Sequence, residues 1–89
     1  MARDRRLRKQ YGITLSQYNQ MFEAQKGQCA ICETHQSKLK HRLSVDHNHK
    51  TGTIRSLLCE NCNHALGLVR ESSEIAIKLS LYIQQHNNP

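Results

Sequence analysis

The chain has 89 residues, enough for one small domain, and 37% of them are apolar, with one phenylalanine, three tyrosines and no tryptophan. No apolar run is long enough for a membrane-spanning helix, and no apolar stretch follows the basic N-terminus as it would in a signal peptide, so we expect a cytoplasmic protein. The formal charge of +6, from 13 lysines and arginines against 7 acidic residues, favours a polyanionic partner such as nucleic acid, although basic charge also serves solubility.

The first predicted elements are two helices. Residues 4–11 are charged and form helices well, and Gly12 fits a helix stop. Thr14 is expected to open the second helix because Gln17, three residues later, completes a capping-box pattern. Gly27 is expected to close this helix just before the first cysteine pair. The apolar stripe of the second helix consists of Leu15, Tyr18 and Phe22.

The middle of the chain predicts a hairpin. Residues 33–42 are polar and are expected to form a loop. Residues 43–46 alternate apolar and polar side chains, which is typical of a half-buried strand. Thr51 and Gly52 form a turn, and residues 53–58 form the second strand.

Two further helices are predicted to follow. Residues 59–62 are expected to form a turn, and a short helix is expected from Asn63 to about Val69. Ser72 or Ser73 caps a last helix, whose apolar side we interpret, like that of the second helix, as core packing. This apolar side consists of Ile75, Leu79, Tyr82 and Ile83. The element order predicts an α+β fold in one domain over residues 1–89, divided into a basic helical part (1–27), a core (28–70) and a C-terminal helix (71–89).

The four cysteines are the clearest motif. Cys29 and Cys32 are separated by two residues, as are Cys59 and Cys62, and 26 residues lie between the pairs. Two such turns can direct four thiolates at one point, which suits a closed, structural zinc site. Two disulfides are disfavoured in a reducing compartment, and a redox Cys-x-x-Cys motif needs only one pair. A metal would also help a chain that buries only about 60–65% of its unfolded surface.

A second constellation lies around the predicted hairpin. Asp46 and His47 end the first strand, and Asn63 follows the second cysteine pair, which a shared zinc would hold nearby. Carboxylate and amide oxygens suit Mg²⁺, and an imidazole that titrates near neutral pH suits a general base for water. A base, a divalent ion and a basic surface are what phosphodiester hydrolysis needs. The alternative is that Asp46 caps a turn and His47 only hydrogen-bonds within the hairpin.

Four segments of the sequence resemble the recombination endonuclease VII family of phage-type nucleases, within the HNH or ββα-metal superfamily. The resemblance covers roughly residues 8–85, and its most specific part is Asp46 to Gly67. The matching segments are Tyr11-Gly12-Ile13-Thr14, Gly27-Gln28-Cys29-Ala30-Ile31-Cys32, Val45-Asp46-His47-Asn48-His49-Lys50-Thr51-Gly52 and Ile54-Arg55-Ser56-Leu57-Leu58-Cys59-Glu60-Asn61-Cys62-Asn63-His64-Ala65-Leu66-Gly67.

The resemblance implies a small ββα-metal (His-Me finger) fold with a four-cysteine structural zinc, and a DNA endonuclease that uses Mg²⁺ or Mn²⁺. It implies that Asp46 and Asn63 hold the catalytic ion, that His47 activates water, and that His49 contacts or polarises the scissile phosphate. Cleavage is expected to leave 5′-phosphate and 3′-hydroxyl ends, in the host cell cytoplasm if the protein is phage-encoded. The cations assigned to DNA phosphates are Arg3, Arg5, Arg6, Arg8, Lys9, Lys50 and Arg55.

Two points depart from the best-known relatives. Plain HNH nucleases usually carry an asparagine before the second cysteine pair, where Ile54 and Arg55 stand here, so the chain fits the endonuclease VII branch. Members that resolve branched DNA are longer and dimerise through an extended C-terminal region, for which we expect no counterpart here. Nicking or nonspecific cleavage is therefore as well supported as junction resolution. A homodimer through the terminal helices stays open. His64 lies outside the motif. The rival hypothesis is a zinc-dependent nucleic-acid-binding module without catalysis.

Overall fold

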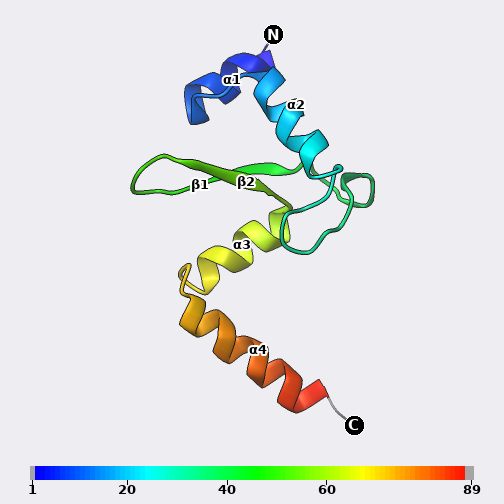
Figure 1. The fold of residues 1–89 in the computed structure, drawn as a ribbon, viewed down its shortest axis with the longest axis vertical. Helices are drawn as coiled ribbons and strands as arrows, with labels where there is room; N and C mark the ends of the chain where they lie inside the picture. The colour runs from blue at the N-terminus through cyan, green and yellow to red at the C-terminus, as the bar shows by residue number, and fades with distance from the viewer. Residues whose placement is uncertain (1, 88–89) are drawn as a thin grey trace.

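The computed structural model describes residues 2–87, so the outermost residues of the predicted N- and C-terminal parts lie outside it. Four α-helices, one short 3₁₀ turn and a two-stranded sheet follow one another within these residues, which confirms the α+β class and the element order. Helices α1 and α2 lie on one side of the hairpin, and α3 and α4 lie on the other (Figure 1). The elements are α1 (Ala2–Tyr11), α2 (Leu15–Ala24), η1 (Gln36–Lys38), β1 (Ser44–His47), β2 (Ile54–Leu58), α3 (Glu60–Leu68) and α4 (Ser73–Asn87).

The start of α2 is fixed by local hydrogen bonds. The hydroxyl of Thr14 accepts from the backbone N–H of Gln17 at 3.0 Å, and the side chain of Gln17 accepts from the N–H of Thr14 at 2.8 Å. The predicted capping box is therefore confirmed. Asp4 of α1 accepts from the N–H of Leu15 at 2.7 Å, which satisfies a further N-terminal donor and ties the two helices together.

The end of α2 lies shortly before Gly27. The helix stops at Ala24, and the chain turns through two residues with positive φ, Lys26 at 56° and Gly27 at 70°. A Cβ at residue 27 would lie 2.7 Å from the His35 side chain and 3.0 Å from that of Phe22, so this position needs glycine. The N–H of Gly27 donates to the carbonyl oxygen of Phe22 at 2.9 Å, so Gly27 still closes the last helical turn, as predicted, and also shapes the approach to the first cysteine pair.

Strands β1 and β2 pair antiparallel with an irregular register. Val45 pairs with Leu57 and His47 with Ile54, so that two residues of β2 lie opposite Asp46. Such a bulge re-aims side chains and increases the local twist. It occurs at the residue where the sequence places an ion ligand.

The buried core is thin and lies around the hairpin. Leu43, Leu57 and Cys29 are its largest fully buried side chains. Leu57 is also held at its backbone, because the Gln25 side chain accepts from its N–H at 2.9 Å and donates to its C=O at 3.0 Å. The other buried apolar residues are Leu7, Ile13, Tyr18, Val45, Leu58 and Cys59.

Helix α3 begins before its predicted start. It starts at Glu60, because the sulfur of Cys59 acts as the N-cap and accepts from the N–H of Cys62 at 3.4 Å. Glu60, Asn61 and Cys62 therefore lie inside the first helical turn rather than before it, and the predicted start, Asn63, follows them within the helix. The prediction missed this start because a thiolate is an unusual capping group, whereas serine, threonine, asparagine and aspartate are the common ones.

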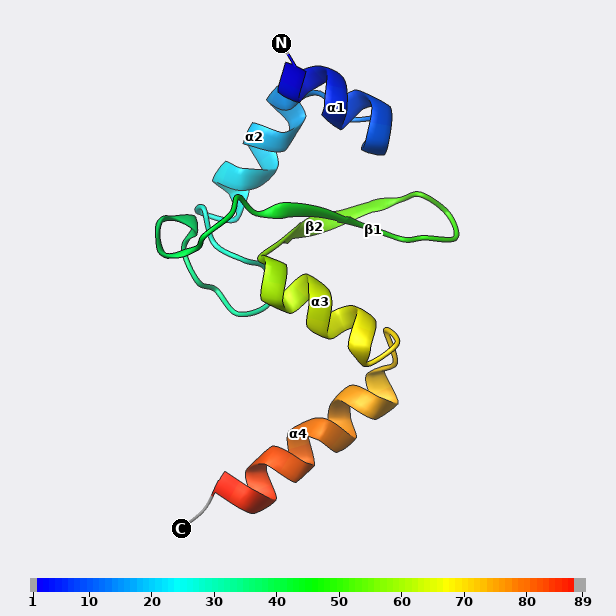
Figure 2. The same cartoon turned by 180° about the vertical axis from the view of Figure 1, so that it is seen from behind.

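The prediction that the apolar side of α4 packs in the core is wrong. The side chain of Ser72 caps the helix as expected, accepting from the N–H of Ile75 at 3.2 Å. The helix then runs away from the hairpin (Figure 2), and Leu79, Tyr82 and Ile83 are 48%, 63% and 46% exposed. Periodicity identifies the apolar face of a helix but not what covers it. No described helix is both long and apolar enough to cross a membrane.

Candidate functional site

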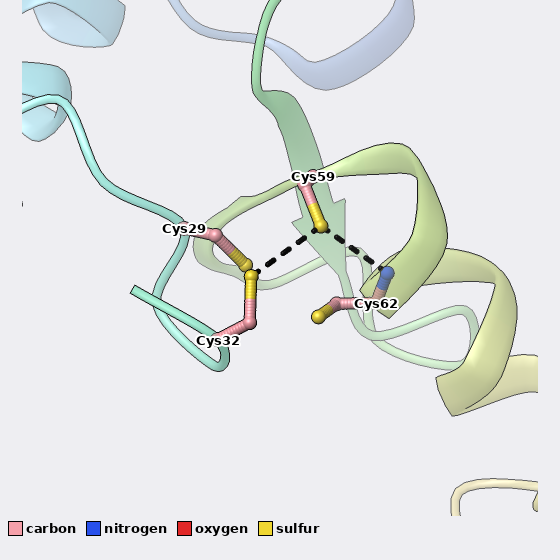
Figure 3. A group of neighbouring side chains, drawn as sticks. All are labelled: Cys29, Cys32, Cys59 and Cys62. Carbon is pink, nitrogen blue, oxygen red and sulfur yellow. Dashed lines mark hydrogen bonds between the residues drawn. The ribbon is translucent and has the colours of Figure 1, made fainter. Parts of the chain in front are cut away.

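The four cysteines converge from the two predicted turns. One ligand sulfur from each of Cys29, Cys32, Cys59 and Cys62 lies within 4.8 Å of all the others, and the sulfurs of Cys32 and Cys59 are 3.8 Å apart (Figure 3). A tetrahedral zinc with Zn–S bonds of about 2.3 Å would separate its sulfurs by about 3.8 Å. These residues can therefore hold a metal ion such as zinc.

Backbone and hydroxyl groups support the sulfurs. The sulfur of Cys29 accepts from the N–H of Ile31 at 3.4 Å, and that of Cys32 lies 3.2 Å from the hydroxyl of Thr34. The Thr34 contact lowers the pKa of the Cys32 thiol to about 6. The N–H groups around Cys29 also lower the pKa of its thiol, although burial opposes this. These contacts therefore stabilise the negatively charged thiolate form of Cys29 and Cys32.

The pKa of the Cys62 thiol shifts in the opposite direction. Burial raises the pKa of its thiol, and hydrogen bonding to Cys59, Cys32 and Cys29 raises it further. Four thiolates within 4.8 Å repel one another, so the last one deprotonates only when a cation compensates the charge. The set of donors therefore fits a divalent metal better than four free thiols.

Asp46, His47 and His49 lie together at the end of the hairpin. Asp46 is 8% exposed and is the buried charged residue of the core region. The ring centres of His47 and His49 are 4.6 Å apart, and the ring centre of Tyr11 lies 5.5 Å from that of His47. A buried carboxylate and a half-buried imidazole therefore follow one another in sequence at the bulge.

Arg55 occupies both oxygens of Asp46. Its Nε donates to Oδ2 at 2.7 Å and one Nη donates to Oδ1 at 3.1 Å. The same Nη lies 2.8 Å from the carboxylate of Glu71 and 3.3 Å from the carbonyl oxygen of His47. The two carboxylates, Asp46 first, raise the already high pKa of Arg55, so the guanidinium remains charged. Arg55, which the sequence assigns to DNA phosphates, is therefore paired with two carboxylates in this structure.

Asn63 lies in the first turn of α3, next to the cysteine group, and α3 packs against β1. Its residue is exposed, and its side chain makes no hydrogen bond within the described part of the chain. Hydrogen bonds and a ring contact join Asp46, Arg55, His47 and His49 into one cluster, whereas Asn63 lies on α3, the helix that packs against β1. His64 is exposed on the same helix.

The predicted phosphate-binding cations form two groups. Arg3 and Arg6 of α1 line a hollow of about 300 Å³ with His41 and Arg42, and Arg3 also stacks on Tyr18, its Cζ lying 4.5 Å from the ring centre. A second hollow, of about 440 Å³, is lined by Asn48, His49, Lys50, Arg55, Arg70 and Glu71.

The remaining predicted cations lie on α1. Arg8 pairs with Asp4 at 2.7 Å, and Arg5 and Lys9 are exposed. Helix α1 reaches the cluster through Tyr11, which lines the first hollow and also contacts His47.

Three residues of this region were not singled out from the sequence. Glu71 pairs with Arg55, Arg70 lines the second hollow, and Tyr11 flanks His47. Tyr11 was part of a matching segment but received no role. Glu71 and Arg70 lie after α3 with φ of 52° and 57°, and no spacing pattern marks them.

The sequence matches the recombination endonuclease VII family over residues 4–85. It is 52% identical over 65 residues to the Gene 59 protein of Mycobacterium phage L5, an alignment of 72% of this chain and 39% of that protein. It is 45% identical over 76 residues to the Gene 59 protein of Mycobacterium phage D29, covering 84% of this chain and 46% of that protein. The chain thus spans less than half of these curated relatives, and no solved structure matches it. The chain belongs to the recombination endonuclease VII family.

Proposed function

We propose that the protein is an HNH-type DNA endonuclease that hydrolyses phosphodiester bonds at the cluster of Asp46, His47 and Asn63. The single observation that carries this proposal is the pairing of a buried Asp46 with an adjacent half-buried His47 at the hairpin bulge, in a member of a nuclease family. The matched family and the basic charge of the chain support DNA as the substrate.

The donor set fits a hard divalent ion. Asp46 offers carboxylate oxygens and Asn63 an amide oxygen, and such ligands suit Mg²⁺ or Mn²⁺ that keeps water and phosphate oxygens in its shell. Bound there, the ion would supply stabilisation of the charge that develops on phosphate and leaving oxygen. This arrangement corresponds to a ββα-metal site built from β1, β2 and α3.

The other side chains have separate roles in hydrolysis. His47 takes the proton of the attacking water as general base, and the ring of Tyr11 restricts its rotation. His49 contacts the scissile phosphate. The cations that hold the flanking phosphates are Arg3, Arg5, Arg6, Arg8, Lys9, Lys50 and Arg55.

The four cysteines bind one structural zinc in this proposal. Four protein ligands leave no open position, so this zinc takes no part in hydrolysis. It holds the turn of Cys29 and Cys32 against the start of α3, and so positions Asn63 relative to the hairpin. The exposed apolar face of α4 is compatible with a homodimer, and the similarity to phage proteins supports action in a host cytoplasm.

One observation favours the rival function, a zinc-dependent nucleic-acid-binding module. Arg55 engages both oxygens of Asp46, as it would if this carboxylate were only a structural counter-ion. The rival needs the cysteines and the cations but not His47.

Cleavage of a supercoiled plasmid with Mg²⁺ or Mn²⁺ separates the two functions. The endonuclease nicks the plasmid, and His47→Ala slows nicking by about 100-fold or more, the usual range for loss of a general base. His86→Ala, which alters an exposed histidine on α4, serves as the matched control and keeps full activity. DNA binding, measured by fluorescence anisotropy, is retained in both variants. Equal nicking by the wild type and His47→Ala removes His47 from catalysis, and binding without nicking in all three proteins supports the binding module.

A further inference from the structure

The carboxylate of Asp46 is already paired with a cation, the guanidinium of Arg55. The Arg55 guanidinium makes a bidentate ion pair with this carboxylate, at 2.7 and 3.1 Å, and Asp46 is 8% exposed. A Mg²⁺ ligand atom would have to lie about 2.0–2.1 Å from its ion. A guanidinium on both oxygens obstructs that approach and repels a second cation in this poorly solvated place.

Arg55 also has a second carboxylate within reach. The Nη that contacts Asp46 lies 2.8 Å from Glu71, whose side chain is 37% exposed. Glu71 stands in the turn after α3, and both views show this turn on the same side of the molecule as the hairpin loop (Figures 1 and 2). Arg70 and Glu71 both adopt left-handed backbone in this turn, with φ of 57° and 52°. Arg55 can therefore leave Asp46 without losing a charged partner.

The second hollow lies next to the Arg55–Glu71 pair, so Arg55 can still contact a ligand there after it leaves Asp46. The hollow of about 440 Å³ is lined by Arg55, Glu71, Lys50 and Arg70 together with two polar residues of the hairpin loop. A guanidinium that remains on Glu71 still faces this hollow, whose lining includes two cations that the proposed function assigns to DNA phosphates, Lys50 and Arg55.

We propose that Arg55 is an exchangeable counter-ion of Asp46, which the catalytic divalent ion displaces. Glu71 is then the positioning residue that retains Arg55 beside the hollow described above. This inference rests on the proposed function, since it takes Asp46 as an ion ligand. The exchange keeps the carboxylate paired before the ion arrives, because an unpaired buried charge is costly. It also explains why a metal ligand lies opposite an arginine at the bulge.

The test is a Mn²⁺ titration of the zinc-loaded protein without DNA, followed by the electron paramagnetic resonance of the free ion. Arg55→Met removes the competing cation and is expected to tighten Mn²⁺ binding by at least about 5-fold. Glu71→Gln leaves Arg55 with Asp46 alone and is expected to weaken binding by at least about 2-fold. Arg70→Met is the matched control, since Arg70 lines the same hollow but forms no ion pair within residues 2–87.

Binding by Arg55→Met that is no tighter than binding by Arg70→Met overturns the exchange and makes the ion pair structural. A second measurement covers the case in which Arg55→Met does not fold. In the wild type, saturating Mg²⁺ should shift the ¹H–¹⁵N resonance of the Arg55 Nε–H, and an unmoved resonance while the His47 amide shifts contradicts the proposal.

Two further outcomes distinguish failure of the exchange from failure of the proposed function. If Asp46→Asn binds Mn²⁺ as the wild type does, Asp46 is not an ion ligand, and both proposals fall together. If neither the wild type nor Arg55→Met binds Mn²⁺ without DNA, the exchange is refuted, while plasmid nicking still decides whether the protein is an endonuclease.

Discussion

The side-chain amide of Gln25 forms hydrogen bonds with both backbone groups of Leu57, accepting from its N–H at 2.9 Å and donating to its C=O at 3.0 Å. Gln25 thereby acts as a one-residue extension of the sheet along the outer side of β2. Since Leu57 is fully buried and lies two residues before Cys59, this pair links α2 to the second cysteine turn.

Replacing Gln25 with alanine should leave the N–H of Leu57 without a partner. We expect a loss of about 1–3 kcal/mol in the free energy of unfolding, because an unsatisfied buried donor keeps its full desolvation cost. Chemical denaturation measures this loss. Gln20→Ala, at an exposed position of the same helix, is the control and should change stability by less than about 0.5 kcal/mol. Similar losses in the two variants would contradict this role.

Replacing Cys59 with serine should remove a zinc ligand while leaving a hydroxyl that can still cap α3. We expect the purified protein to lose its stoichiometric zinc and its cooperative thermal transition, because metal binding in such small sites is part of the folding free energy. Elemental analysis and circular dichroism measure the two effects. Asn61→Ala, an exposed non-ligand in the same turn, should keep one zinc per chain. A folded, zinc-loaded Cys59→Ser protein would refute the structural role.

The hydroxyl of Tyr18 donates to the carbonyl oxygen of Leu43 inside the core. Tyr18→Phe should cost about 1–2 kcal/mol at neutral pH, because this buried acceptor loses its donor. Burial raises the pKa of the phenol above its usual 10.0. The contribution is therefore complete below pH 10 and is lost as pH rises above it towards the raised pKa.

Denaturation of the wild type and Tyr18→Phe from pH 7 to pH 11 measures this dependence. The stability difference between them should shrink above pH 10. Tyr82→Phe, at a 63% exposed site, should show no such difference at any pH. A difference that stays constant across the range would exclude ionisation of Tyr18 as its cause.

Helix α4 should contribute little to the folding of the monomer. Its apolar residues Ile77 and Leu81 are 60% and 57% exposed, so a chain that ends at Ser72 should melt within about 3 °C of the full chain at micromolar concentration. Scanning calorimetry measures the difference. A fall of more than about 10 °C, with a full-chain melting point that rises with protein concentration, would mean that a second copy covers this face.

The parts of the fold set by neighbouring residues could be predicted from the sequence. Thr14 and Gln17 stand at capping-box spacing, and the two Cys-x2-Cys turns bring their sulfurs to one point, so local geometry alone predicts both features. The helix start at Glu60 could not be predicted in this way, because its cap is a sulfur whose orientation depends on the other three.

The features that depend on register or on packing partners were not predictable. The Asp46–Arg55 pair depends on a bulge that puts two β2 residues opposite one β1 residue, and strand alternation does not encode such a shift. Glu71 reaches the pair through a left-handed turn at residues without a glycine signal. The stripe on α4 was identified correctly as apolar, but the core packing assigned to it was wrong because no described element covers it.

The central claim is that the Asp46–His47 cluster hydrolyses DNA with a divalent ion distinct from the cysteine-bound metal. The most direct test is the rate of plasmid nicking by zinc-loaded protein freed of other divalent ions, before and after Mg²⁺ is added, with zinc content measured throughout. The account predicts no nicking before addition and nicking after it, at a constant content of about one zinc per chain. Nicking that needs no added ion, or no nicking at any Mg²⁺ or Mn²⁺ concentration, would contradict it.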